Sequence, residues 1–278
     1  MEDELYGKIE RIALAGAPNT RDLGGIPAEG GRRIKKKKLI RSGDLHEITA
    51  RDRQVLTEEY GLRKVIDFRT QEERRQRPDQ VMEAAEYLHI PILDETTLGI
   101  TREKEADRDM LGQMLSMLQG EQNCRTAAEG YMRQLYSSFL QQEFARREYR
   151  RFFEELLKET SGSILWHCTA GKDRVGIGTM LLLEALGTDR RIIMEDYLKV
   201  NEFSRSVVEI QSRIAFERTG RREAEELVKK LFSVEPSYLE AVYAEVERDF
   251  GSMEAFLENE MGLDPEKKER LKELYLES

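Results

Sequence analysis

The sequence predicts an α/β fold with a central, mainly parallel sheet flanked by helices. Short apolar, β-branched segments recur in the first hundred residues and again at residues 164–167, and helical patterns lie between and after them. Alternating strand and helix signals are typical of a parallel sheet covered by helices. A chain of 278 residues can bury a sizeable core. With no internal repeat or linker, we expect a single domain over residues 1–278 with helical insertions.

Four strands are expected in the first hundred residues, at residues 11–15, 39–41, 64–68 and 87–92. The last two are the strongest because each is apolar and β-branched over about five residues. Between the strands at 39–41 and 64–68, Thr49 is a candidate N-cap for a helix that runs to Tyr60 and is stopped by Gly61.

From residue 102 onward the pattern is mostly helical. Apolar residues at helical spacing over 110–118 indicate a core-facing stripe, and a long helix is expected over 127–159. A strand at 164–167 precedes an apolar helix at 175–186. Further helices fill the chain from residue 190, with breaks expected at Gly187, Gly220, Pro236, Gly251 and Gly262.

Extra helices are expected to form a lid over a ligand pocket. The sequence leaves two segments open for this role, residues 102–120 and residues 204–232. It gives no prediction of the oligomeric state.

The net charge of −9 disfavours a general nucleic-acid-binding protein, which needs a basic face. Two cysteines, Cys124 and Cys168, are too few for a disulfide framework. The three histidines show no ligand spacing with them, so no zinc or other metal site is expected.

The first ten residues carry five charged side chains and no apolar segment, so no signal peptide is expected. No apolar run approaches the roughly 18 residues that a membrane-spanning helix requires. The cytoplasm is therefore the expected compartment, and secretion without a visible signal peptide stays open.

The segment from His167 to Arg174 carries the clearest chemistry: an apolar strand, then Cys-x5-Arg, then a helix. The small residues Thr169, Ala170 and Gly171 allow successive backbone N–H groups to converge on one anion at a helix N-terminus. The same field stabilises a thiolate, which makes Cys168 a candidate nucleophile. We call residues 168–174 the Cys168 loop.

Charged residues complete the Cys168 loop. The planar fork of Arg174 can bind two phosphate oxygens, and Lys172 adds a positive charge suited to a substrate with more than one phosphate. A leaving oxygen needs a proton, and the candidate acids are Asp173 and Asp94. A nucleotide-binding loop is excluded because Asp173 stands where Ser or Thr is required and the upstream glycine is missing.

At these residues the sequence resembles the bacterial tyrosine phosphatase family of the mycobacterial protein tyrosine phosphatase B type. The resemblance rests on the loop His-Cys-Thr-Ala-Gly-Lys-Asp-Arg and on further motifs along nearly the whole chain. These are residues 19–25, residues 40–43, residues 65–69 with Glu73 after them, residues 196–198, and residues 236–239 to 262–263.

The resemblance implies a protein-tyrosine-phosphatase-like fold and hydrolysis of phosphotyrosine through a phosphocysteine intermediate on Cys168, with Arg174 binding the phosphate. It implies inorganic phosphate as product and no cofactor. It also favours Asp173 as the acid, while Asp94 is retained because dual-specificity phosphatases place an acid on a similar loop. Members of the family are often permissive, also accepting phosphoserine, phosphothreonine or phosphoinositides, a breadth associated with Lys172 and Asp173.

Two alternatives remain. One is a phosphatase of the same mechanism for phosphoinositides or small phosphate esters. The other is a catalytically weak protein that binds phosphorylated ligands. The second draws on one departure from the family pattern, because Val175 stands where the family usually has Thr.

Two residue pairs outside the loop have open roles. Arg21 and Asp22 either line the pocket or pin the turn at Gly24. Asp67 and Arg69 follow a strand, where they either meet a ligand or pair with each other.

Overall fold

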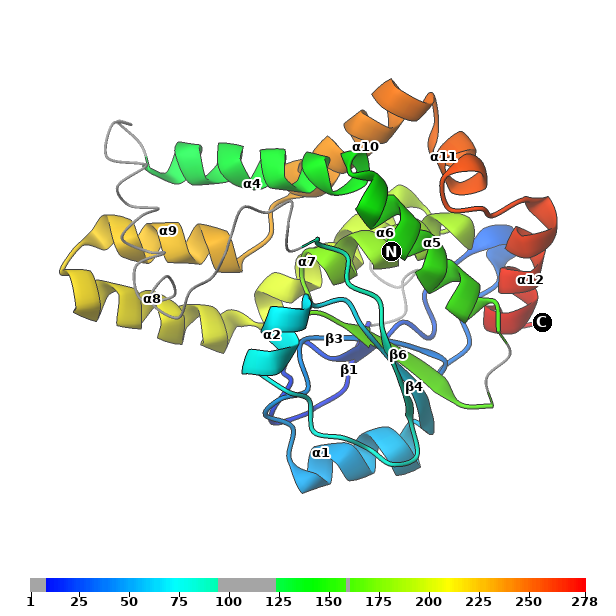
Figure 1. Cartoon of the computed structure of the whole chain (residues 1–278), viewed down its shortest axis with the longest axis horizontal. Helices are drawn as coiled ribbons and strands as arrows, with labels where there is room; N and C mark the ends of the chain where they lie inside the picture. Colours follow the sequence, from blue (N-terminus) through cyan, green and yellow to red (C-terminus); the bar gives the residue numbers. More distant parts are fainter. Residues whose placement is uncertain (1–8, 95–123, 159–160) are drawn as a thin grey trace, which may run out of the picture.

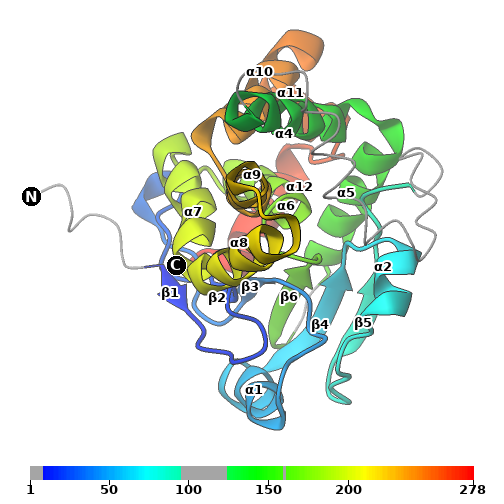
Figure 2. The same ribbon diagram turned by 90° about the vertical axis from the view of Figure 1, so that its left-hand side faces the viewer.

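The computed structural model describes residues 9–94, 124–158 and 161–278. Its centre is a six-stranded sheet in the order β1-β2-β3-β6-β4-β5. The strands are β1 (Glu10–Arg11), β2 (Arg21–Asp22), β3 (Leu39–Ser42), β4 (Leu62–Asp67), β5 (Glu86–His89) and β6 (Ser163–His167). Strands β3, β6, β4 and β5 are parallel, and β1 and β2 form an antiparallel edge (Figures 1 and 2). The predicted α/β class with a mainly parallel sheet is confirmed.

The central strands are buried on both faces, as the apolar runs indicated. In β4, Val65 belongs to one core, which includes Leu56 beneath the sheet, while its neighbour Ile66 belongs to the larger core on the other face. In β6, Trp166 belongs to the larger core and Leu165 to the core on the opposite face. Successive side chains of a strand point to opposite faces, so each central strand contributes to both cores. Figure 1 shows α1 below the sheet and α5, α6 and α12 above it.

The predicted helix after Thr49 is present, in two parts. Thr49 caps α1 (Ala50–Gln54) in a reciprocal capping box with Asp52, and the chain continues as the π-helical turn η2 (Val55–Glu59). Gly61 then takes the left-handed φ of +60° that ends the helix. The strand expected at residues 11–15 is wrong beyond Arg11, because the N–H of Leu14 turns back to the carbonyl of Ile12.

The single helix expected at residues 127–159 is also wrong. The structure has α4 (Cys124–Gln141) and α5 (Glu143–Leu156), separated at Gln142 by a ψ of 121°. The guanidinium of Arg146 donates to the carbonyls of Leu140 and Gln141, at 2.9 and 2.7 Å. It thereby satisfies acceptors that the end of α4 leaves without helical partners.

The remaining helices follow the predicted breaks, with one further break that was not predicted. They are α6 (Arg174–Ala185), α7 (Arg190–Phe203), α8 (Arg205–Thr219), α9 (Arg222–Phe232), α10 (Pro236–Phe250), α11 (Met253–Asn259) and α12 (Pro265–Tyr275). The further break is at Ser204, between α7 and α8. Gly187, Gly220, Gly251 and Gly262 all have positive φ, and Pro236 opens α10.

The two lid candidates have different outcomes. Residues 102–120, with the apolar stripe at 110–118, lie outside the described residues. Residues 204–232 form the antiparallel pair α8 and α9, whose own small core contains Ala215, Ala224 and Leu227. In Figure 2 this pair stands in front of the sheet, and its role as a lid stays a prediction. Across the described residues, every helix is too short or too polar to cross a membrane.

Candidate active site

The Cys168 loop lies at the carboxyl edge of the sheet, where open α/β folds bind ligands. Strand β6, between β3 and β4, delivers the chain directly to Cys168, and α6 begins at Arg174. Cys168 is buried, with 2% of its surface exposed, and is free of any disulfide. The loop thus connects the central strand to an apolar, buried helix, as expected.

Hydrogen-bond donors from other parts of the chain bind the backbone carbonyl groups of the Cys168 loop. Asn19 Nδ2 donates to the carbonyls of Ala170 and Gly171, at 3.1 Å each. Arg41 Nη2 donates to Gly171 O at 3.1 Å, and the backbone N–H of Asp44 donates to Thr169 O at 3.0 Å. Carbonyls that are bound from outside the loop let the intervening N–H groups turn toward its interior. A backbone anion site requires such an arrangement, and anion binding by the loop stays a prediction.

Gly171 is required where it stands. Its φ is +69°, in the left-handed region, and a Cβ there would come within 2.4 Å of the carbonyl oxygen of Ser42. Only glycine meets both conditions without displacing the backbone. The tight contact sets the loop directly against the end of β3.

A buried charge cluster supports the back of the loop. Asp196 of α7 pairs with Arg21 at 2.7 Å and also with Arg41, and all three side chains are at most 1% exposed. Burial would raise the pKa of Asp196, but the two guanidinium groups outweigh it and hold the pKa below its usual value. Burial and the neighbouring Arg41 lower the pKa of Arg21 to about 10.

Arg174 is oriented by Glu73, which lies on α2 (Gln71–Gln76), a short helix that we did not predict. Arg174 Nη1 and Nη2 donate to the two carboxylate oxygens of Glu73 at 2.6 and 2.8 Å. Thr169 Oγ1 donates to Glu73 at 2.6 Å. Burial would raise the pKa of Glu73, but Arg174 and Thr169 outweigh it and hold the pKa well below its usual value. The bidentate pair fixes the plane of the guanidinium at the loop.

Asp173 occupies the N-cap position of α6, yet its carboxylate does not cap the helix. Its Oδ1 instead accepts hydrogen bonds from Lys172 Nζ at 2.6 Å and from the hydroxyl of Tyr136 at 2.5 Å. Tyr136 is fully buried and comes from α4. The loop therefore places the Asp173 carboxylate directly before Arg174, and its role as the acid stays a prediction.

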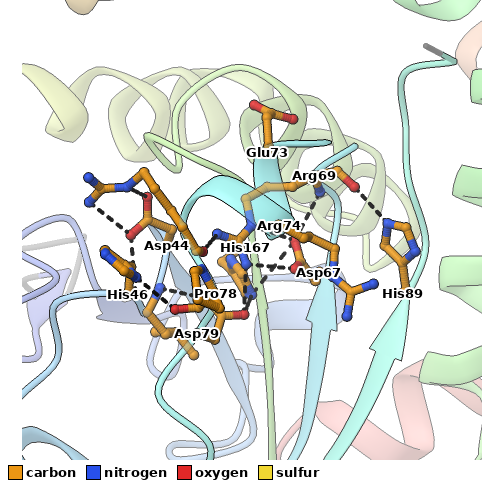
Figure 3. Close-up of polar contacts among 12 residues, drawn as sticks. Asp44, His46, Asp67, Arg69, Glu73, Arg74, Pro78, Asp79, His89 and His167 are labelled. Carbon is orange, nitrogen blue, oxygen red and sulfur yellow. Dashed lines mark hydrogen bonds and ion pairs between the residues drawn. The ribbon is translucent and has the colours of Figure 1, made fainter. Parts of the chain in front are cut away.

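A second charge cluster surrounds His167, the residue directly before Cys168 (Figure 3). His167 Nε2 is 3.2 Å from Asp79 Oδ2 and 3.9 Å from Asp67 Oδ1. Arg69 bridges the carboxylates, at 2.8 Å from Asp67 and 2.9 Å from Asp79, and Arg74 adds a contact of 3.1 Å to Asp67. Burial would lower the pKa of His167, but the two carboxylates outweigh it and raise the pKa.

The ligand atoms of Asp67, Asp79 and His167 lie within 4.8 Å of one another, close enough to hold a metal ion. The guanidinium of Arg69 already contacts both carboxylates and supplies the positive charge there. We therefore describe these residues as a buried ion-pair network. Of the two roles open for Asp67 and Arg69, the structure favours pairing with each other.

The other residues that the sequence singled out have structural positions around the sheet and the main core. Asp22 pins the turn, accepting from the N–H groups of Gly24 and Lys37 at 2.9 and 2.7 Å, and Arg21 supports the loop through Asp196. Asp94 is half-buried and lies beyond the end of β5. Val175 is fully buried in the main core.

Several contacts of the loop were not predicted, among them those of Asn19, Arg41, Glu73 and Tyr136. Asn19 and Glu73 lie within motifs that carry the family resemblance, but no role was assigned to them. The capping box of Thr70 and Glu73 is a local signal that could have revealed α2. Tyr136 lies within a predicted helix and has no sequence signal of its own.

Comparisons with known proteins agree over most of the chain. The sequence profile of the tyrosine phosphatase family matches residues 12–277. A relative from Cupriavidus necator, named among the tyrosine-protein phosphatases, is 29% identical over 258 residues, covering 91% of this chain and 85% of its own length. The triple specificity protein phosphatase PtpB of Mycobacterium tuberculosis is 28% identical over 263 residues, covering 88% of this chain and 91% of its own.

Proposed function

The chain belongs to the tyrosine phosphatase family, and we propose that it hydrolyses phosphate monoesters with Cys168 as the nucleophile. The observation that carries this proposal is the outward tethering of the loop carbonyls around a buried cysteine, with Arg174 fixed beside it. Such a cradle binds a tetrahedral dianion at the start of a helix.

In the first step, the Cys168 sulfur attacks phosphorus and forms an S–P bond. The bond between phosphorus and the leaving oxygen breaks, and Asp173 gives its proton to that oxygen. The products are the free alcohol or phenol and a phosphocysteine. Arg174 and the loop N–H groups of residues 169–173 stabilise the charge on the phosphoryl oxygens during transfer.

In the second step, water attacks the phosphocysteine. The S–P bond breaks, a proton of the water passes to the Asp173 carboxylate, and inorganic phosphate and the Cys168 thiolate are released. Asp173 is thereby returned to the protonated form that the next cycle requires. Asp94 remains the alternative acid, since it too follows a strand of the sheet.

We propose phosphotyrosine proteins as the primary substrates. The Mycobacterium tuberculosis relative is named a triple specificity protein phosphatase, which supports testing phosphoserine and phosphothreonine as well. The ammonium group of Lys172, buried beside Asp173, adds positive charge at the loop.

The test is phosphate release from a panel of phosphotyrosine, phosphoserine and phosphothreonine peptides and phosphoinositides, with Cys168→Ser as control. Release from the phosphotyrosine peptide that the control abolishes is the expected result. A preference for phosphoinositides would replace the proposed substrate, and no release from any substrate would leave a phospho-ligand-binding protein. Rapid acid quench with a 32P-labelled substrate should trap label on the protein and not on Cys168→Ser.

A further inference from the structure

A buried tyrosine from a distant helix contacts the carboxyl group of Asp173. The hydroxyl of Tyr136, on α4, donates to Asp173 Oδ1 at 2.5 Å, and Lys172 donates to the same oxygen at 2.6 Å. The Tyr136 side chain is fully buried, whereas that of Asp173 is 23% exposed. Oδ1 of the carboxylate is thus held by two donors.

The second oxygen, Oδ2, has no such anchor among the residues that the structure describes. Within the described residues, Asp173 Oδ2 accepts no hydrogen bond from the protein. An aspartate at an N-cap ordinarily accepts from the N–H groups of the first helical turn. Asp173 does not do so in α6. The carboxylate is turned away from the helix and toward Tyr136, leaving one oxygen available for a proton.

The ring of Tyr136 is itself held in place. It packs against Tyr197 of α7 and Tyr238 of α10, with ring centroids 6.1 and 5.5 Å away, and against Phe139 on its own helix at 5.9 Å. Burial raises the pKa of Tyr136 well above its usual value, so the hydroxyl keeps its proton and remains a donor. A donor on such a rigid support can fix the direction of a flexible carboxylate.

We propose that Tyr136 is a positioning residue that holds the Asp173 carboxyl group so that Oδ2 faces the leaving oxygen in the first step and the attacking water in the second. This inference rests on the proposed function, in which Asp173 is the acid. A positioned acid contributes about 10²–10⁴-fold to proton transfer, and loss of orientation should remove part of that factor.

The test is Tyr136→Phe, which removes the donor and keeps the ring. Two substrates separate its effects. The phenoxide that leaves phenyl phosphate is a poor leaving group and needs a proton from the acid. The 4-nitrophenoxide that leaves 4-nitrophenyl phosphate is a stabilised anion and can depart without that proton. We expect kcat/KM to fall about tenfold for phenyl phosphate and to change little for 4-nitrophenyl phosphate.

Two further variants serve as controls for this result. Asp173→Asn should also lose kcat/KM selectively for phenyl phosphate, and by a larger factor than Tyr136→Phe. Tyr275→Phe removes another buried hydroxyl donor, bonded at 2.5 Å to the carbonyl of Leu156, and should leave the ratio of the two substrates unchanged. If Tyr136→Phe does not fold, Tyr136→Leu removes the same donor and is measured instead.

An equal loss on both substrates, or no loss on either, would overturn the positioning role if Asp173→Asn still shows selective loss. If Asp173→Asn shows no selectivity, Asp173 is not the acid. That result would reject the proposed role of Asp173, and this inference with it.

Discussion

The resemblance to the family leads us to expect Thr at position 175, directly after the Cys168 loop, where this chain has Val175. It follows Arg174 directly and is fully buried. A hydroxyl at this position could donate to the departing Cys168 sulfur, and a hydrogen bond to a charged group contributes about 1.5–3 kcal/mol.

We therefore expect breakdown of the phosphocysteine to limit turnover, and Val175→Thr to raise the steady-state rate about tenfold. Burst and steady-state rates from rapid quench measure this, with Val175→Ala as a control that adds no hydroxyl. Unchanged rates in Val175→Thr would show that the departure has no catalytic consequence. The buried hydroxyl should also lower stability by about 1–3 kcal/mol where it lacks a partner.

His167 gives a pH-dependent contribution to stability. Its pKa is raised in the folded protein because Asp67 and Asp79 outweigh its burial. A group with a raised folded pKa contributes stability that is complete below its unfolded pKa, about 6.5, and is lost as pH rises through the folded pKa.

The free energy of unfolding should therefore fall more steeply above about pH 6.5 in the natural protein than in His167→Gln. Urea unfolding at several pH values measures the difference. Burial lowers the pKa of His89 in the folded protein. His89→Gln should therefore remove a contribution that makes the free energy of unfolding rise with pH, which is opposite in sign to the contribution of His167. Parallel curves for the natural protein and His167→Gln would contradict the raised pKa.

At the scale of elements, the sequence predicted what is encoded locally. Strand β6 and helix α6 are apolar over most of their length, and β4 contains the apolar pair Val65 and Ile66, so their burial could be inferred from the sequence. Strand β2 has two residues and α2 has no buried residue, so neither shows a periodic pattern. Strand β2 depends on tertiary contacts, since it pairs between β1 and β3, whereas α2 has only the local signal of its capping box. Propensity cannot predict such contacts.

Helix α2 gives a prediction of its own, because it presents Glu73 to Arg174. Glu73→Gln keeps the shape but removes the charge that fixes the guanidinium, so kcat/KM for a phosphotyrosine peptide should fall about tenfold or more. Glu72→Gln is the matched control, since Glu72 pairs with the exposed Arg75 on the same helix and should have little effect. Equal effects of the two variants would contradict the role given to Glu73.

At the scale of the molecule, the loop is assembled from distant parts of the chain. Asn19 bonds to Gly171 across 152 residues, and Arg21 to Asp196 across 175. The sequence motif predicted the loop, Cys168 and Arg174. It could not predict which side chains hold the loop, because those contacts depend on how β3, α4 and α7 pack together.

The buried Asp196 is the sharpest test of this assembly. Asp196→Asn leaves two buried guanidinium groups without their carboxylate, so we expect a loss of about 3–5 kcal/mol in the free energy of unfolding. Glu86→Gln, at a side chain 61% exposed and 3.9 Å from Lys64, should change it by less than about 1 kcal/mol. Urea unfolding measures both variants, and a loss below about 1 kcal/mol for Asp196→Asn would show that the cluster does not support the fold.

The central place of β6 has a consequence for how the protein is made. Strand β6 separates β3 from β4, although both are synthesised more than about ninety residues earlier. Until it arrives, those two strands present open hydrogen-bonding edges to each other and to other chains. Closing such a long-range gap is a slow step in folding. The strand that completes the sheet is also the one that ends at Cys168, so the nucleophile is set in place by the event that closes the core.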